Sequence, residues 1–263
     1  MSKYLAIFKL SWQKSMEYRL DFFGKLILGL ISFSVMVIIF KTVFSQVSFI
    51  AGYSFPMMFT YLAMTKVLHF VTRGNTAKRI ADEIKDGKIS VFLLKPVGYL
   101  RIWLGIFLAD RSFEILVRSL LLVVLLIIVP SLFSFPNIGV LMLFFISVIM
   151  ALSYNYLINT IVAAIGFWVV DIRLFTTAFN LATGFLAGEL VPIDIFPLYL
   201  KKIAEILPFR FLLFFPIKIY QEKISGTALW IEFIQAFLWL FVLIIISRIL
   251  WRKGLKNYEA IGQ

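Results

Sequence analysis

Long apolar segments constrain this chain more than any other feature. The first of them, residues 22–44, carries only two charged side chains, Lys25 and Lys41, and both lie near its ends. A helix that crosses a bilayer needs about 20 apolar residues, and lysines at its ends can extend to the interface. The segment therefore predicts an uncleaved membrane-spanning helix.

The composition excludes a soluble domain. Of 263 residues, 62% are hydrophobic and 15% are charged, against roughly 25% charged in soluble domains. The apolar runs are continuous and do not alternate, which favours helices over a β-barrel. We expect an all-α integral membrane protein that forms one transmembrane domain, residues 1–263. Its six spans are predicted at residues 22–44, 52–72, 112–130, 137–166, 174–190 and 228–250.

The distribution of basic residues orients these spans. The predicted cytoplasmic segments hold 17 of the 26 Lys and Arg residues, and the predicted outer segments hold six. The positive-inside rule then places both termini in the cytoplasm. The net charge of +12 is explained by this bias and by anionic lipid, so nucleic acid is not an expected partner.

The segment before the first span, residues 1–20, predicts an interfacial helix. Its apolar residues Phe8 and Trp12 follow Leu5 by three and seven positions, and its polar side chains fall on another face. Such a helix is suited to lie in the headgroup region.

The cytoplasmic segment 73–101 predicts a short amphipathic helix. Asn75 or Thr76 can cap it, Ile80 and Ile84 lie one turn apart on one face, and Gly87 is placed to end it. Charges of both signs cover the rest: Arg79, Asp82, Glu83, Lys85 and Asp86. One interpretation is a solvated loop. We favour a docking element for a cytoplasmic partner, because an apolar ridge and charges together supply affinity and orientation.

The outer segment 188–226 is too apolar for an ordinary loop. Its four prolines, Pro192, Pro197, Pro208 and Pro216, forbid one spanning helix. Pro197 suits the start of a short helix that ends before Pro208. We expect short helices partly sunk in the outer leaflet.

Small residues mark the fifth span. Gly184 and Gly188 are four residues apart, and Ala178 and Ala182 repeat that spacing. Such pairs let helices approach closely, and packing within one subunit and across a dimer explain them equally well. Glu189 follows at the outer end of this span, whereas the lone histidine, His69, lies near the cytoplasmic end of the second span, where we expect an interfacial polar residue.

Catalytic motifs are absent from the sequence. It has no cysteine and one histidine, which argues against disulfides, thiolate chemistry and zinc or haem sites. It has no G-x-x-x-x-G-K-[ST], H-E-x-x-H or G-x-S-x-G sequence. We predict no catalytic residue, no metal and no cofactor in this chain.

These segments together resemble the membrane subunit, or permease, of type-2 ABC exporters. The stretch RIADEIKDGKISVFLLKP resembles the family's cytoplasmic loop through Ile84, Gly87, Leu93, Leu94 and Pro96. The stretch GELVPIDIFPLYLKKIAEILPF resembles its outer segment through Gly188, Pro192, Pro197, Leu207, Pro208 and Phe209. The Leu-Leu-Lys-Pro form points to a branch whose permeases often occur as unlike pairs.

The resemblance implies a transport mechanism. Two permeases, identical or homologous, would form the path, and separate cytoplasmic P-loop ATPases would use ATP and Mg²⁺. The ATPases would push on a coupling helix between spans two and three (Arg79, Ile80, Asp82, Glu83, Ile84, Asp86 and Gly87). A re-entrant hairpin between spans five and six would form the outer gate (Gly188, Glu189, Pro192, Pro197 and Pro208). The setting would be the cytoplasmic membrane of a bacterium.

Other functions stay open from the sequence. An ion-gradient-driven transporter would need midspan carboxylates, which are scarce, and a non-transporting scaffold or immunity protein would need none. The spans are rich in tyrosine (Tyr53, Tyr61, Tyr154 and Tyr156). They are compatible with an amphiphilic, drug-like, peptide or lipid-linked solute.

Overall fold

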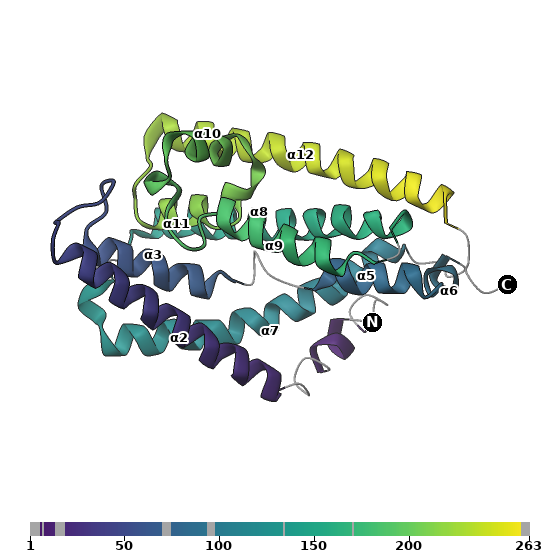
Figure 1. Ribbon diagram of the computed structural model, residues 1–263, viewed down its shortest axis with the longest axis horizontal. Helices are drawn as coiled ribbons and strands as arrows, with labels where there is room; N and C mark the ends of the chain where they lie inside the picture. The colour runs from purple at the N-terminus through teal and green to yellow at the C-terminus, as the bar shows by residue number, and fades with distance from the viewer. Residues whose placement is uncertain are drawn as a thin grey trace.

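The chain forms an elongated bundle of helices in the computed structural model (Figure 1). The structure describes residues 6, 8–13, 19–69, 75–93, 98–133, 135–169 and 171–258. Within these ranges every regular element is a helix, apart from one isolated bridge between Ile50 and Tyr53. The predicted all-α fold is confirmed.

Three helices of the described chain are long and apolar enough to cross a membrane. They are the Ile27–Phe44 part of α2 (Arg19–Phe44), α8 (Ile138–Ala164) continued by η2 (Ile165–Phe167), and α12 (Gly226–Lys256). Each lies on a predicted span. Another long helix, α7 (Tyr99–Ile128), covers the predicted span 112–130 and begins well before it, followed by the short η1 (Pro130–Leu132).

The other two predicted spans contain shorter helices than expected. α3 (Phe55–Val67) has 13 residues and α9 (Arg173–Leu186) has 14. At 1.5 Å per residue each is about 20 Å long, less than the roughly 30 Å of a hydrocarbon core. α9 stops because Gly188 adopts a left-handed conformation, φ +81°, just after it.

The outer segment forms short helices, as predicted, and three of its four prolines stand at helix starts, whereas Pro216 lies inside a helix. The helices are η3 (Ile193–Ile195), α10 (Leu198–Ile206), η4 (Pro208–Phe211) and α11 (Phe214–Tyr220). Pro197 occupies the N-cap position of α10, which ends before Pro208. α11 is largely buried and packs against α8 and α3.

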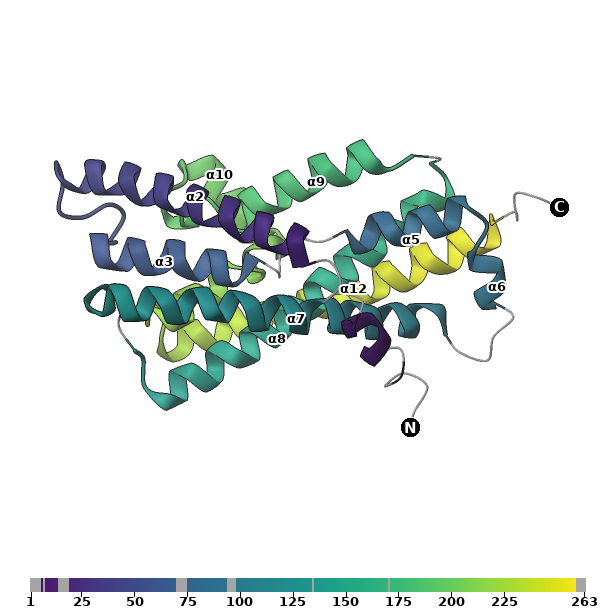
Figure 2. The same cartoon turned by 90° about the horizontal axis from the view of Figure 1, so that it is seen from below.

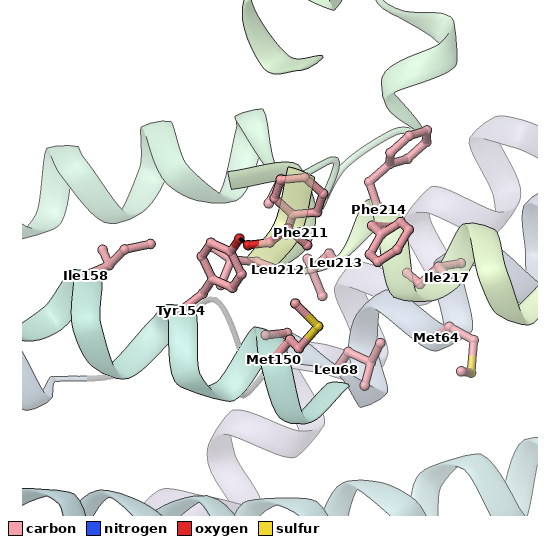
Figure 3. Close-up of a cluster of buried hydrophobic side chains, with 14 of the residues drawn as sticks. Met64, Leu68, Met150, Tyr154, Ile158, Phe211, Leu212, Leu213, Phe214 and Ile217 are labelled. Atoms are coloured by element: carbon pink, nitrogen blue, oxygen red, sulfur yellow. Dashed lines mark hydrogen bonds between the residues drawn. The ribbon is translucent and has the colours of Figure 1, made fainter. Parts of the chain in front are cut away.

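The central helix of the bundle is α8, which packs along α12, α5 and α11. Its buried residues Phe144, Ser147, Ala151, Tyr154 and Ile158 recur every three or four positions, the spacing of one helix face. Figure 3 shows Met150 and Tyr154 of α8 beside Phe211, Leu212 and Leu213 of the outer segment. The core therefore joins α8 to that segment.

The two ends of the bundle differ. α5 (Thr76–Lys85) and α6 (Ile89–Leu93) lie at one end with the end of α12, and α10 and α11 lie towards the other (Figures 1 and 2). At the α5 end Tyr99 stacks on Trp251, with ring centroids 5.5 Å apart. This contact joins α7 to α12.

Parts of two sequence predictions lie outside the described residues. Residues 8–13 are helical, and the Trp12 ring meets Phe113 of α7 edge-on at 5.9 Å. Leu5 of the predicted interfacial helix, and Leu94 and Pro96 of the cytoplasmic motif, fall in the undescribed ranges.

Candidate functional site

The helix α5 contains the predicted coupling residues, and its apolar side is turned into the bundle. Ile80 is fully buried and Ile84 is 4% exposed, because α5 packs on α8 and η2. The two isoleucines therefore do not form the outward ridge expected from the sequence. Their amphipathic pattern is satisfied inside this chain.

Two charged residues of α5 bind α7. The Arg79 guanidinium donates to Asp110 at 2.8 Å and lies over the Trp103 ring at 4.9 Å. The Glu83 carboxylate accepts from the Tyr99 hydroxyl at 2.7 Å and from the Trp103 indole at 3.2 Å. These bonds fix the rotation of α5, so Arg79 and Glu83 are engaged within the chain.

The remaining charges of α5 border an open groove, called here the α5 groove. It has a volume of about 300 Å³ and lies between α5 and the segment that leads into α9. Its lining includes three acidic and three basic side chains: Lys78, Asp82, Lys85, Asp86, Asp171 and Arg173. Charges of both signs in one concave surface can orient a complementary partner.

Local hydrogen bonds keep two of these carboxylates ionised. The Arg173 side chain donates to Asp171, and its backbone N–H adds a bond of 2.9 Å. These bonds lower the pKa of Asp171 below its usual range. The Lys88 ammonium, 2.7 Å from Asp86, lowers the pKa of Asp86. Asp171 and Asp86 therefore stay ionised at neutral pH.

Gly87 ends α5 as the sequence predicts. It has φ +73° and donates to the Ile84 carbonyl at 3.2 Å, as a left-handed helix cap does. The turn directs the chain into α6.

The predicted outer gate begins at a well-defined turn. Gly188 donates to Phe185, and Glu189 donates to Gly184 at 3.0 Å, the two bonds of a Schellman motif. The Tyr61 hydroxyl of α3 donates to the Gly188 carbonyl at 2.6 Å. A Cβ at Gly188 would lie 2.6 Å from that hydroxyl oxygen, so the site requires glycine.

Glu189 meets His69, and the sequence placed them at opposite ends of their spans. The carboxylate lies 3.4 Å from His69 Nε2, and Glu189 is 9% exposed. The expected separation is wrong, because α3 and α9 are short and their ends meet inside the bundle. Of the three prolines assigned to the outer gate, Pro192 and Pro208 are buried, and Pro197 is exposed.

The small residues of α9 do not form one stripe. Gly184 and Gly188 are buried, whereas Ala178 and Ala182 are exposed. Positions 182 and 184 differ by about 200° around a helix, so the two pairs lie on opposite sides. Packing within the chain explains the glycines and leaves the alanine face open.

The four tyrosines noted in the sequence donate hydrogen bonds to other parts of this chain. Their hydroxyls donate to Asp194 (from Tyr53), Gly188 (from Tyr61), Ala236 (from Tyr154) and Leu100 (from Tyr156). In this structure they therefore join segments that are far apart in the sequence.

A polar cluster that the sequence analysis missed joins the outer segment to α12. Arg210 and Lys218 lie 3.8 Å and 3.5 Å from Glu232, and Arg210 also bonds Gln235. Arg210 is 7% exposed, a burial that its charged partners make tolerable. Glu232 is the lone Glu of α12, and its place in an apolar stretch was the sequence signal that could have revealed this cluster.

Metal ligands do not gather in the described ranges, where no group of three His, Cys, Asp or Glu residues is suited to hold an ion.

Comparison with known proteins identifies a family. Residues 30–262 match the family described as ABC-2 family transporter protein. A search of the curated proteins found no match.

Proposed function

The chain belongs to the ABC-2 family of transporter proteins, and from that premise we propose that it is the permease subunit of an ATP-powered exporter. A permease is the membrane component of such a transporter and is not itself catalytic. ATP and Mg²⁺ would be used by a separate cytoplasmic P-loop ATPase. The three long apolar helices support an integral membrane protein.

The α5 groove is the proposed ATPase docking surface. The observation that carries this proposal is the division of α5: Ile80 and Ile84 are buried in the bundle, whereas Asp82 and Asp86 remain outward in a concave surface. A helix held on one side and charged on the other can transmit a push from a partner to the bundle. Coupling of this kind requires contacts that differ between two states.

The proposed topology has six spans with both termini in the cytoplasm of a bacterium. In it, α5 is cytoplasmic and α10 lies in the outer leaflet. The broken segment 188–226 would be the re-entrant hairpin, with Gly188, Glu189, Pro192, Pro197 and Pro208 at the outer gate.

A second permease, identical or homologous, is the proposed partner within the membrane. The open face of α9 at Ala178 and Ala182 supports close packing against another helix. Membrane lipid would cover the other apolar faces. The exported solute would be small and amphiphilic, drug-like, peptide or lipid-linked.

The test is purification of the tagged chain in mild detergent from the cells that make it. We expect a P-loop ATPase to co-purify, and mass spectrometry then counts one kind of permease or two. Asp82→Lys and Asp86→Lys together should lower the bound ATPase by about tenfold or more, because like charges replace complementary ones. The control is Lys253→Glu, an exposed charge at the same end of the bundle and outside the groove.

Two outcomes would oppose the proposal. Unchanged ATPase binding in the doubly substituted variant would remove the groove as the docking surface. Transport that needs no ATP and collapses with an ion gradient would favour the secondary transporter, for which the buried Glu189–His69 pair is the supporting observation.

A further inference from the structure

The N-terminus of α5 is capped from another helix. Asn75 occupies the N-cap position, but its side chain makes no capping bond to α5 as the structure describes it. Instead, the Ala77 backbone N–H donates to the Asn159 Oδ1 of α8 at 3.1 Å. The first turn of a helix leaves N–H groups without partners, and a side-chain oxygen satisfies one here.

Asn159 is itself held in place by α8. Its Nδ2 donates to the Asn155 carbonyl at 2.8 Å and lies 3.3 Å from Asn155 Oδ1. Because Nδ2 is committed to these acceptors, Oδ1 faces α5. Both asparagines are buried, at 3% and 6% exposure. Polar side chains inside an apolar membrane helix are rare without a role.

A second contact joins the same two elements. A Cβ built on Gly166, in η2 at the end of α8, would lie 3.0 Å from the Ala81 Cβ and 3.3 Å from its Cα. The α5 backbone therefore comes very close to η2 at this point. α5 is held at two places, by a directional bond near its start and by a close approach one turn later.

From α8 the contacts continue to the outer half of the molecule. The Tyr154 ring, five residues before Asn159, stacks on Phe211 of η4 with centroids 5.7 Å apart, and its hydroxyl donates to Ala236 of α12. Figure 3 shows Tyr154 and Phe211 facing each other between the two elements. A displacement of α8 would therefore reach both the outer segment and α12.

We propose that Asn159 is a positioning residue that couples α5 to α8. When the ATPase displaces α5, the Asn159–Ala77 bond keeps α5 and α8 moving as one body. Apolar contacts such as that of Ile80 are not directional and allow sliding, whereas a hydrogen bond at a helix end fixes the position along the axis. The inference rests on the proposed function, because it requires a push on α5.

The first experiment compares Asn159→Leu with a control. Leucine removes the Oδ1 acceptor from this position. Thr160→Val is the matched control, since Thr160 is equally buried on α8 but its hydroxyl bonds only Tyr156 of the same helix. The readouts are amide hydrogen exchange at residues 76–79 in the purified chain, and solute transported per ATP hydrolysed in the complex.

In Asn159→Leu we expect exchange at residues 76–79 to rise roughly 3- to 20-fold, the range that corresponds to one bond between membrane helices. Transport per ATP should fall by a similar factor while the ATPase stays bound. Thr160→Val should remain near the wild type. Unchanged exchange or unchanged transport per ATP in Asn159→Leu would overturn the proposal. Failure of the wild-type chain to bind an ATPase would instead refute the proposed function and remove the coupling role with it.

The second experiment locks the two helices together. The natural chain has no cysteine, so Ala81→Cys with Gly166→Cys introduces one pair without background. A Cβ at position 166 would lie 3.0 Å from the Ala81 Cβ, closer than the roughly 3.8 Å of an average disulfide, so the bond forms once the two backbones separate by a few tenths of an ångström or more. If α5 and α8 move as one body, the oxidised variant transports as well as the reduced one. A block that dithiothreitol reverses would mean that the helices slide, and would overturn the proposal.

Discussion

The helices α5 and α10 are both short and amphipathic, yet they differ in whether large apolar side chains are buried or exposed. α5 buries Ile80 and Ile84 and leaves Asp82 exposed. α10 buries Ala204 and exposes large apolar side chains, among them Ile206 at 69%. An amphipathic pattern alone therefore does not determine which face of a short helix is covered.

The cause lies in the neighbours that each helix meets. α5 packs on the end of α8. There Asn159 accepts a hydrogen bond from the Ala77 N–H, and Gly166 leaves room for the close approach of Ala81. α10 is linked to the chain at its polar side, where Lys201 lies 3.4 Å from Asp194. An outward charged face suits water and a protein partner, and an outward apolar face suits lipid. The difference supports placing the two helices in different environments.

The largest expected effect concerns the turn that positions the outer segment. Gly188→Val places a β-branched residue at φ +81° and a Cβ against the Tyr61 hydroxyl. We expect the free energy of unfolding to fall by about 3 kcal/mol or more, from backbone strain and overpacking together. The measurement is thermal unfolding in detergent micelles.

Its control is Gly226→Ala, at φ +59° with nothing within 4 Å of an added Cβ. That variant should lose only about 1 kcal/mol, from the backbone alone. Equal losses in the two variants would show that the contact with Tyr61 does not matter.

A smaller effect should separate two neighbouring acids of α5. Glu83→Ala removes the acceptor of Tyr99 and Trp103 and should cost about 2 kcal/mol of unfolding free energy, because bonds to a charged group are strong. Asp82→Ala, on the exposed side, should stay within about 0.5 kcal/mol of the wild type. Comparable stabilities of the two variants would contradict the division of α5 into an anchored and an open side.

The smallest effect tests the lipid exposure of α10. Ile206→Lys should cost about 1 kcal/mol in bilayer nanodiscs, since a charge on a lipid-facing surface near the interface is only moderately unfavourable. Glu205→Lys, beside it on the polar side, should cost less. If Ile206→Lys leaves the stability in nanodiscs unchanged, this face of α10 meets water.

The sequence by itself determined the all-α class and several of the points where helices begin or end. Apolar runs marked α2, α8 and α12, and residues with restricted or permissive backbones marked the breaks: Gly87, Gly188, Pro197 and Pro208. These features are local, since each depends on a residue and its neighbours within one or two turns. They were therefore open to prediction.

Only the tertiary structure decided which surfaces meet. Periodicity identified the apolar side of α5, but it did not show that α8 covers that side. The predicted spans placed Glu189 and His69 far apart, although they lie 3.4 Å from each other. The bond from Ala77 to Asn159 joins positions 82 residues apart, a separation that no local pattern encodes. The open charged face of α5 is what remains after these long-range contacts form, and so the candidate site depended on the fold.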